Sequence, residues 1–581
     1  MASRSKAFGW FLLCVVLGAL GLAAAMRMRH ASGPSTSKSL LVYEVPAEIE
    51  ESVPSSSGFS LADLRPSRPT LFEITDAIRR AAGDDHVRGL ALHIGDVQWG
   101  WARVAEFRQA LAEFRRSGKP IYASFSGGGE QAYLIASSAD HLSMPPTANL
   151  GLDGLSISAM FLKGTYDKLG IRPNFAHVGT FKSAVEQYTR EDLSPDARVA
   201  LEALLDDSFG LLVDSLAVAR DLPRDSLARL IDRGPYSAED ALAAGLVDTL
   251  VHEMDLDSLA ARAVSRKPVE PLSLTKYLTD PGLDDPTATV FAIISAEGTI
   301  APGKDRDQPF GGRMLGGESL RDALLEAGRE SDVKAVILRI DSPGGSGQAS
   351  DDVWREVRRL RLKKPVIVSM SNLAASGGYY IACGADVIVA DPATITGSIG
   401  VFGGKLNVLG LYHKLGLTIE TVSRGRNANM LSQFEDFSPE EAAKFQEQMD
   451  SFYRTFLARV SEGRGMTPAA VDSIAQGRVW TGLAARRLGL VDTLGGLSTA
   501  VAIARRHAKV AEGTPVRLEP FPSPRRAFWH QAFDSFLEDD EDARSARTST
   551  AVPELLAAWL RASAFPTGTV LALMPFTLEM R

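Results

Sequence analysis

The amino-acid sequence predicts an α/β fold that is present twice along the chain. Strand-like and helix-like segments alternate, several strand-like segments are apolar almost throughout, and the two halves of the chain resemble each other. Alternating strands and helices are typical of α/β units, and strands of a parallel sheet covered on both faces lose the polar alternation of a half-exposed strand. With 581 residues the chain is also too long for one ordinary hydrophobic core.

An internal repeat supports the duplication. Three pairs of segments align at a nearly constant separation: VRGLALHI (87–94) with VKAVILRI (333–340), EQAYLIASSAD (130–140) with SGGYYIACGAD (376–386), and AAGLVDTL (243–250) with RLGLVDTL (487–494). The separation is 246 residues for the first two pairs, and the third pair slips by two. A register held over this length indicates one fold present twice. We expect the first copy at 39–272 and the second at 273–518.

The second half shows the expected order of elements most clearly. Apolar runs predict its strands, and amphipathic periodicity predicts its helices. In chain order we expect a strand at 289–295, a helix near 318–329, a strand at 333–340, a Gly-rich turn, a helix at 350–361, a strand at 365–370, a long helix at 439–464 and a closing segment at 468–490.

The N-terminus predicts a membrane segment. Residues 8–26 read FGWFLLCVVLGALGLAAAM, an uncharged run long enough for one span. The alternative is a cleaved signal peptide, with the alanines at 23–25 as the cleavage site. Basic residues flank both ends of the run, so the positive-inside rule orients the span only weakly. We expect residues 1–30 to form the anchor or signal segment and 31–38 to form a linker.

The C-terminal tail, 519–581, differs in composition from the repeats. Its acidic run at 538–542 is expected to be solvated, as charge runs usually are. Its apolar stretch around 570–576 is too short to span a membrane, and we expect it to pack on the body of the protein or at a subunit contact.

Composition and missing motifs exclude several functions. A net charge of −8 gives no basic surface for nucleic acid. The sequence contains no phosphate-binding G-x-x-x-x-G-K-[ST] motif and no zinc-binding H-E-x-x-H motif, so we expect no nucleotide, metal or other cofactor. The two cysteines, Cys14 and Cys383, are not expected to form a disulfide, because Cys14 lies in the apolar N-terminal run.

Two segments of the second half carry candidate chemistry. DSPGGS at 341–346 follows a buried strand, and its Gly344 and Gly345 can present backbone N–H groups to a ligand. ASGGYY at 375–380 places Ser376 at the start of a helix, where a nucleophile would benefit from the N–H of Gly377 in an oxyanion hole. The alternatives are a tight structural turn and an ordinary N-cap serine.

The repeat distinguishes these alternatives. In the repeat register Ser376 aligns with Glu130, and Gly344 and Gly345 align with Gln98 and Trp99. The first copy therefore keeps the fold but lacks both the serine and the glycine turn. A serine and a turn that were only structural would be expected in both copies, so the difference favours a chemical role.

A serine nucleophile needs a base, and the histidines do not supply one in any recognisable motif. His413 and His507 are the histidines of the second half, and neither lies in a pattern typical of catalysis. A lysine can act instead where burial keeps it neutral.

The turn DSPGGS, the segment ASGGYYIA and the run TGSIGV at 396–401 resemble the signal peptide peptidase A family of the ClpP–crotonase superfamily. The resemblance covers almost the whole chain, including the N-terminal segment, and so matches the long form of that family. It implies two tandem ClpP/crotonase-like repeats, with Ser376 as nucleophile and with a general-base lysine in the first repeat. The matching stretch is GTFKSAVE at 179–186, which makes Lys182 the base. Read alone, Lys182 would be a surface lysine.

The resemblance also implies an activity and a location. It implies a serine endopeptidase that degrades hydrophobic remnant signal peptides, anchored in the bacterial inner membrane as a homotetramer with its catalytic body on the periplasmic side. Lys182 aligns with Ala428, so each repeat would supply one catalytic residue and the site would lie where the repeats meet. The competing functions are a crotonase-type acyl-CoA enzyme and an inactive membrane scaffold.

Overall fold

The computed structural model describes residues 38–51, 69–265, 269–278, 285, 287–307, 313–522 and 570–574. The expected membrane segment at 8–26 and the acidic run at 538–542 lie outside these residues. Among the helices of the described part, none is both long and apolar enough to cross a bilayer.

Each half of the chain builds a sheet whose main path is parallel. The strands of the first sheet are β1 (Ser39–Val45), β2 (Val87–Ile94), β3 (Ile121–Phe125), β4 (His141–Met144), β8 (Thr249–Leu250) and β9 (Glu270–Ser273). The corresponding strands of the second are β10 (Thr289–Glu297), β14 (Val333–Ser342), β16 (Val366–Ala375), β17 (Val387–Ala390), β21 (Thr493–Leu494) and β22 (Val516–Phe521). The first sheet has the order β8-β4-β3-β2-β1-β9, and the second contains the matching path β21-β17-β16-β14-β10-β22. The predicted α/β class with tandem repeats is confirmed.

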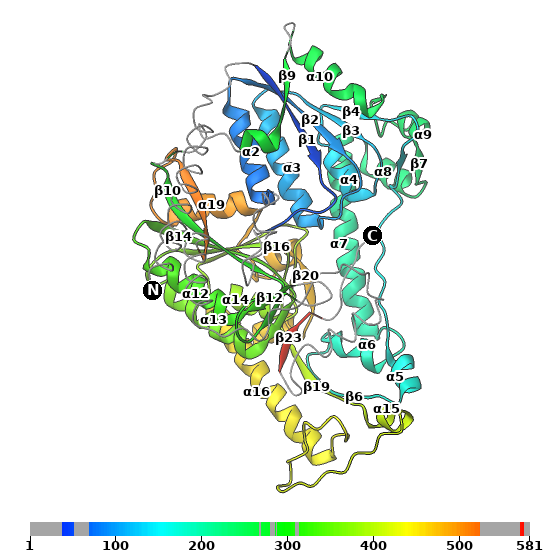
Figure 1. The fold of residues 1–581 in the computed structure, drawn as a ribbon, viewed down its shortest axis with the longest axis vertical. Helices are drawn as coiled ribbons and strands as arrows, with labels where there is room; N and C mark the ends of the chain where they lie inside the picture. The colour runs from blue at the N-terminus through cyan, green and yellow to red at the C-terminus, as the bar shows by residue number, and fades with distance from the viewer. Residues whose placement is uncertain are drawn as a thin grey trace, which may run out of the picture.

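Helices fill the space between the two sheets and cover their outer faces. Between the sheets lie α2 (Leu71–Gly83), α3 (Trp101–Arg116) and α19 (Leu497–His507), as Figure 1 shows. The amphipathic helices expected in the second half form as α12 (Gly317–Arg329) and α13 (Gly347–Leu360), each with an apolar face in the core. The N-cap of the long helix α16 (Pro439–Arg464) is Ser438, which forms a reciprocal capping box with Glu441.

A third sheet combines strands from both repeats and from the tail. Its order is β12-β13-β11-β15-β23-β19-β6. The strands that matter here are β6 (Arg172–Val178) of the first repeat, β15 (Gly344–Ser346) and β19 (Val401–Asn407) of the second, and β23 (Leu571–Leu573) of the tail (Figure 1). β6 and β19 pair antiparallel along their whole length. Because of this pairing, the segment that follows Val178 lies against the second repeat.

Candidate active site

Ser376 occupies a sharp turn between strand β16 and helix α14 (Gly377–Ala382). Its φ of 54° and ψ of −111° are unusual for a residue with a side chain, and such strain is stored most often at functional sites. The turn is held by the Ser376 N–H, which donates to the Gly397 carbonyl at 2.8 Å. The Ser376 hydroxyl makes no capping hydrogen bond to α14, so the N-cap interpretation of this side chain is wrong.

Lys182 reaches Ser376 from the first repeat. Its Nζ lies 2.9 Å from Ser376 Oγ, and both side chains are completely buried. The loop before Lys182 is fixed to the second repeat, because the Phe181 N–H donates to the Gln476 carbonyl at 2.7 Å. Gly477 packs directly on the lysine: a Cβ placed on Gly477 would lie 2.6 Å from both Lys182 Cβ and its backbone N. The surface-lysine alternative is therefore wrong.

Ser398 completes the surroundings of the lysine amine. Its Oγ lies 3.0 Å and its carbonyl oxygen 3.1 Å from Lys182 Nζ. These two contacts and Ser376 Oγ all involve uncharged oxygens, and burial lowers the pKa of Lys182 well below its usual 10.5. A neutral amine has two hydrogens and one lone pair. It can donate both hydrogens to Ser398 and accept the Ser376 hydroxyl proton with the lone pair.

The glycine turn lies against the start of α14. Gly344 and Gly345 have φ values of +96° and +156°, which favour glycine. A Cβ on Gly344 would lie 2.5 Å from the Gly377 N atom, so the turn and the helix start are in direct contact. The Gly344 N–H donates to Ser342 Oγ at 3.1 Å, whereas Gly345 pairs with tail residue Ala572. The Gly344 N–H is therefore engaged within its own turn, and Gly377 and Gly345 remain the candidate glycines for an oxyanion hole.

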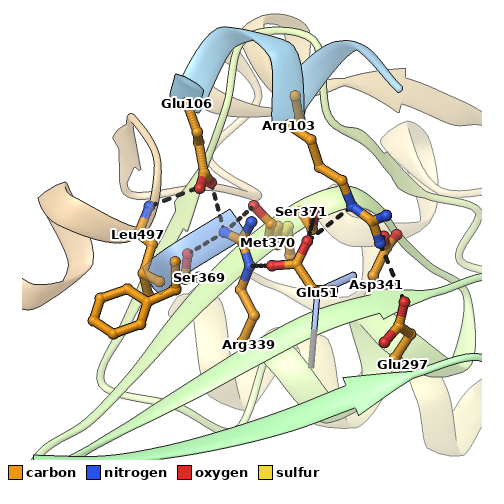
Figure 2. Close-up of polar contacts among 12 residues, drawn as sticks. Glu51, Arg103, Glu106, Glu297, Arg339, Asp341, Ser369, Met370, Ser371 and Leu497 are labelled. Carbon is orange, nitrogen blue, oxygen red and sulfur yellow. Dashed lines mark hydrogen bonds and ion pairs between the residues drawn. The ribbon is translucent and has the colours of Figure 1, made fainter. Parts of the chain in front are cut away.

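A buried network of charges joins the two repeats (Figure 2). Arg339 of β14 contacts Glu51 at 2.5 Å and Glu106 of α3 at 2.6 Å. Arg103 of α3 contacts Asp341, at the start of the glycine turn, at 2.5 Å. Each arginine therefore pairs with carboxylates of the other repeat.

Asp341 connects this network to the site. Its second carboxylate oxygen accepts the Leu373 N–H at 3.0 Å, three residues before Ser376. Burial raises the pKa of Asp341 to about 6, and the Arg103 charge opposes that rise. For Glu51, burial would raise the pKa, but Arg339 and Arg103 lower it to about 2. The network keeps Glu51 ionised and fixes both site segments to the first repeat.

The equivalent positions of the first repeat have other roles. Glu130, which aligns with Ser376, accepts the N–H groups of Asp153 and Gly154 at 3.1 and 2.9 Å. The turn that aligns with the glycine turn docks on Asn372, which donates to the Trp99 carbonyl at 2.8 Å and accepts the Ala102 N–H at 3.1 Å. In the first repeat these positions therefore make hydrogen bonds that hold its own loops and dock it on the second repeat.

The arrangement matches the chemistry of a serine hydrolase. A strained serine, a buried amine within hydrogen-bond reach and backbone N–H groups beside the serine are the parts that acyl transfer requires. His413 and His507 are exposed, and the described residues contain no group of side chains suited to a metal ion.

Comparison with known proteins identifies the family. The model of "Peptidase family S49" matches residues 113–266 and again 358–511, one match in each repeat. The chain belongs to this family. It is 34% identical to the chloroplastic serine protease SPPA of Arabidopsis thaliana over 78% of this chain and 68% of that protein. It is also 34% identical to Protease 4 of Salmonella typhi over 78% of this chain and 74% of that protein. A protein of Enterococcus faecium named for signal peptide peptidase SppA matches 38% of this chain and 65% of its own length, at 34% identity.

The family settles the class of enzyme. The chain is a serine peptidase, and the resemblance to the signal peptide peptidase A family is confirmed. The acyl-CoA alternative is excluded. Sequence reasoning did not single out Ser398 or Gly477. Ser398 lies in the TGSIGV run that supported the resemblance, and that run was the available signal.

Proposed function

We propose that the chain is a membrane-anchored endopeptidase that degrades remnant signal peptides, with Ser376 as nucleophile and Lys182 as general base. The observation that carries the proposal is the 2.9 Å contact between two completely buried side chains from different repeats. A lysine in such a place has no structural reason to be there, because burying an amine without a carboxylate partner is costly.

The reaction follows from the geometry. Neutral Lys182 accepts the Ser376 proton while Ser376 Oγ attacks the carbonyl carbon of the peptide bond. The negative charge on the carbonyl oxygen is stabilised by the N–H groups of Gly377 and Gly345. The lysine ammonium then gives its proton to the leaving nitrogen, which leaves an acyl-enzyme. Lys182 next takes a proton from water, whose oxygen releases the acyl group and regenerates Ser376.

Substrate class and location are proposed on wider grounds. The printed name of the Enterococcus faecium relative supports signal peptides as substrates. The apolar residues 8–26 support an anchor, with residues 1–30 before two repeats at 39–272 and 273–518 and the tail at 519–581. We place the repeats outside the cytoplasm, at a bacterial inner membrane, and propose a homotetramer. The location and the homotetramer are proposed from the resemblance to the signal peptide peptidase A family.

One set of variants tests the catalytic pair. Ser376→Ala and Lys182→Ala should each abolish cleavage of a hydrophobic fluorogenic peptide, while Lys168→Ala, which removes an exposed lysine, should keep wild-type activity. A serine-directed fluorophosphonate should label the wild type and fail to label Ser376→Ala. If Lys182→Ala is labelled and cleaves as the wild type does, the base is wrong. If no form cleaves any peptide, the chain is an inactive scaffold.

A further inference from the structure

Arg478 packs on the rings of two aromatic side chains beside Lys182. Its guanidinium carbon Cζ lies 5.1 Å from the centre of the Phe181 ring and 4.2 Å from the centre of the Trp480 ring. Both distances fall within the range of about 6 Å over which an arginine is attracted to the face of an aromatic ring. Phe181 directly precedes Lys182, so this stack joins the base loop, residues 179–182, to the second repeat.

The backbone of the segment 476–478 contacts both sides of the lysine's surroundings. The Gln476 carbonyl accepts the Phe181 N–H at 2.7 Å, and the Arg478 carbonyl accepts the Ser398 N–H, also at 2.7 Å. Gln476 and Ser398 have φ values of 51° and 50°, in the region that residues with side chains rarely adopt. Such strain is stored most often at functional sites, so strain and hydrogen bonds both place this segment at the active site.

Trp480 connects the stack to the turn that carries Ser376. Its indole N–H donates to the Ile474 carbonyl at 3.0 Å, which fixes the ring. A Cβ on Gly397 would lie 2.8 Å from Trp480 Cδ1, and the Gly397 carbonyl is the group that accepts the Ser376 N–H. The arginine therefore contacts one aromatic residue next to the lysine and another packed against the backbone that holds the serine.

Ion pairing does not account for Arg478. Within the part of the chain that the structure describes, no carboxylate pairs with it, and its Nε is buried without a hydrogen-bond partner. The repeat gives a second indication. IAQGRV at 474–479 aligns with IDRGPY at 231–236, so Arg478 aligns with Pro235. The copy that contacts the lysine has the arginine and the other copy does not, which favours a role at the site.

We infer that Arg478 is a positioning residue for the proposed base, because its packing on Phe181 and Trp480 holds the base loop closed over Lys182. This inference rests on the proposed function, and in particular on Lys182 as base. The three hydrogen-bond partners of the Lys182 amine are uncharged oxygens, so the amine stays neutral as long as water is excluded. A loosened loop lets water reach the amine and stabilise its ammonium form. Arg478 thus favours the proton-accepting lysine without touching the substrate.

The pH dependence of activity tests the inference. Arg478→Met keeps most of the aliphatic volume and removes the guanidinium. The midpoint of the rise of kcat/KM with pH should move up by about one unit, so that activity well below the midpoint falls roughly tenfold, while the alkaline plateau stays within about threefold of wild type. The matched control is Arg459→Met. Arg459 Cζ lies 4.1 Å from the centre of the Trp354 ring, on helices that do not carry the base loop, so its loss should leave the midpoint unchanged.

A second pair of variants removes the stack from the other side. Phe181→Leu should give the same shift as Arg478→Met, and Phe181→Tyr, which keeps an aromatic ring, should keep the wild-type midpoint. Phe181 is half-buried, so these variants test the inference even if Arg478→Met fails to fold. The double variant Arg478→Met/Phe181→Leu should shift the midpoint no further than either single variant, because both remove one interaction.

Two measurements do not depend on peptide cleavage. The rate at which a fluorophosphonate labels Ser376 should show the same shift with pH in Arg478→Met. The amide hydrogens of 180–182 should exchange faster in this variant than in the wild type, because the loop that carries them opens more often.

The outcomes are distinct. If Arg478→Met lowers activity equally at every pH, or if Arg459→Met moves the midpoint as far, Arg478 has only a structural role and the inference is wrong. If Ser376 and Lys182 prove essential for cleavage while Arg478→Met and Phe181→Leu keep the wild-type midpoint, the inference fails and the proposed function stands. If labelling and exchange respond as expected but no peptide is cleaved, the inference holds and the endopeptidase proposal fails.

Discussion

Removing Arg103 should both destabilise the protein and damage the active site. The Arg103 side chain is 13% exposed, and it contacts Asp341 at 2.5 Å, Glu51 at 2.8 Å and Glu297 at 3.2 Å. In Arg103→Met the aliphatic volume is largely kept, but these three carboxylates lose a shared cation. Breaking a buried ion pair by removing one partner costs about 3–5 kcal/mol, because the remaining charge is left uncompensated.

Activity should fall together with stability. Arg103 opposes the effect of burial on Asp341, so its loss should raise the pKa of Asp341 above about 6 and increase the fraction of this carboxyl that is protonated at neutral pH. Asp341 then holds the Leu373 N–H and the glycine turn less firmly. Small displacements of a reacting group can cost on the order of 100-fold in rate, so we expect kcat/KM to fall roughly 10- to 100-fold.

The assay compares two arginines that differ mainly in burial. Arg115 contacts Asp140 at 2.8 Å, but the two side chains are 45% and 31% exposed. Arg115→Met should therefore cost no more than about 1 kcal/mol in urea-induced unfolding, and kcat/KM should not change. Adding Asp341→Asn to Arg103→Met should restore part of the lost stability, because it removes one unpaired buried charge. Equal losses in Arg103→Met and Arg115→Met would refute the coupling of the repeats through this network.

Three further predictions concern Lys182. Because burial lowers its pKa well below 10.5, kcat/KM should rise with pH as the amine loses its proton and then level off well below pH 10.5; a continued rise to that pH would contradict a neutralised lysine. Ser398→Ala removes one hydrogen-bond partner of Nζ and keeps the Ser398 carbonyl, so we expect kcat to fall roughly tenfold, with KM unchanged, in steady-state kinetics. Gly477→Ala should reduce kcat/KM roughly 100-fold, because the added Cβ would lie 2.6 Å from Lys182 Cβ. The control is Gly416→Ala, which should keep near wild-type activity because Gly416 has the same φ of +77° but no atom within 4 Å of an added Cβ.

Local sequence patterns predicted most of the fold because each element is encoded where it forms. The apolar strand at 333–340 and the amphipathic helix at 318–329 became β14 and α12 at nearly the expected bounds. The repeat register predicted a second feature that no single motif carries, one fold present twice, and the path β21-β17-β16-β14-β10-β22 of the second sheet matches the strand order of the first. Ser376 stood out by a local pattern, a serine between small residues after a buried strand, and the comparison of the two repeats then favoured a chemical role over an N-cap.

The rest of the site depends on contacts between segments that are far apart in the sequence. Lys182 came from family resemblance alone, because the residues around it have no periodicity that indicates burial. Its position requires the pairing of β6 with β19 and the packing of Gly477, which lies in the other repeat. Arg103 and Asp341 each look like ordinary surface residues, and only the docking of α3 against the second repeat gives them a role. The tail was expected to pack on the body, and it does so at 571–573, but its sequence does not say where.

The docking of α3 against the second repeat explains why one chain should hold one active site and not two. A Cβ on Gly100 would lie 2.5 Å from the Asn372 side chain, so the first repeat's counterpart of the glycine turn is covered by the second repeat. A strand therefore cannot pair there as β23 pairs with β15. In the second repeat the corresponding turn pairs with strand β23 of the tail. The contact that closes the first turn involves Asn372, which lies four residues before Ser376 on β16. The loss of one site and the positioning of the other are therefore consequences of one interface.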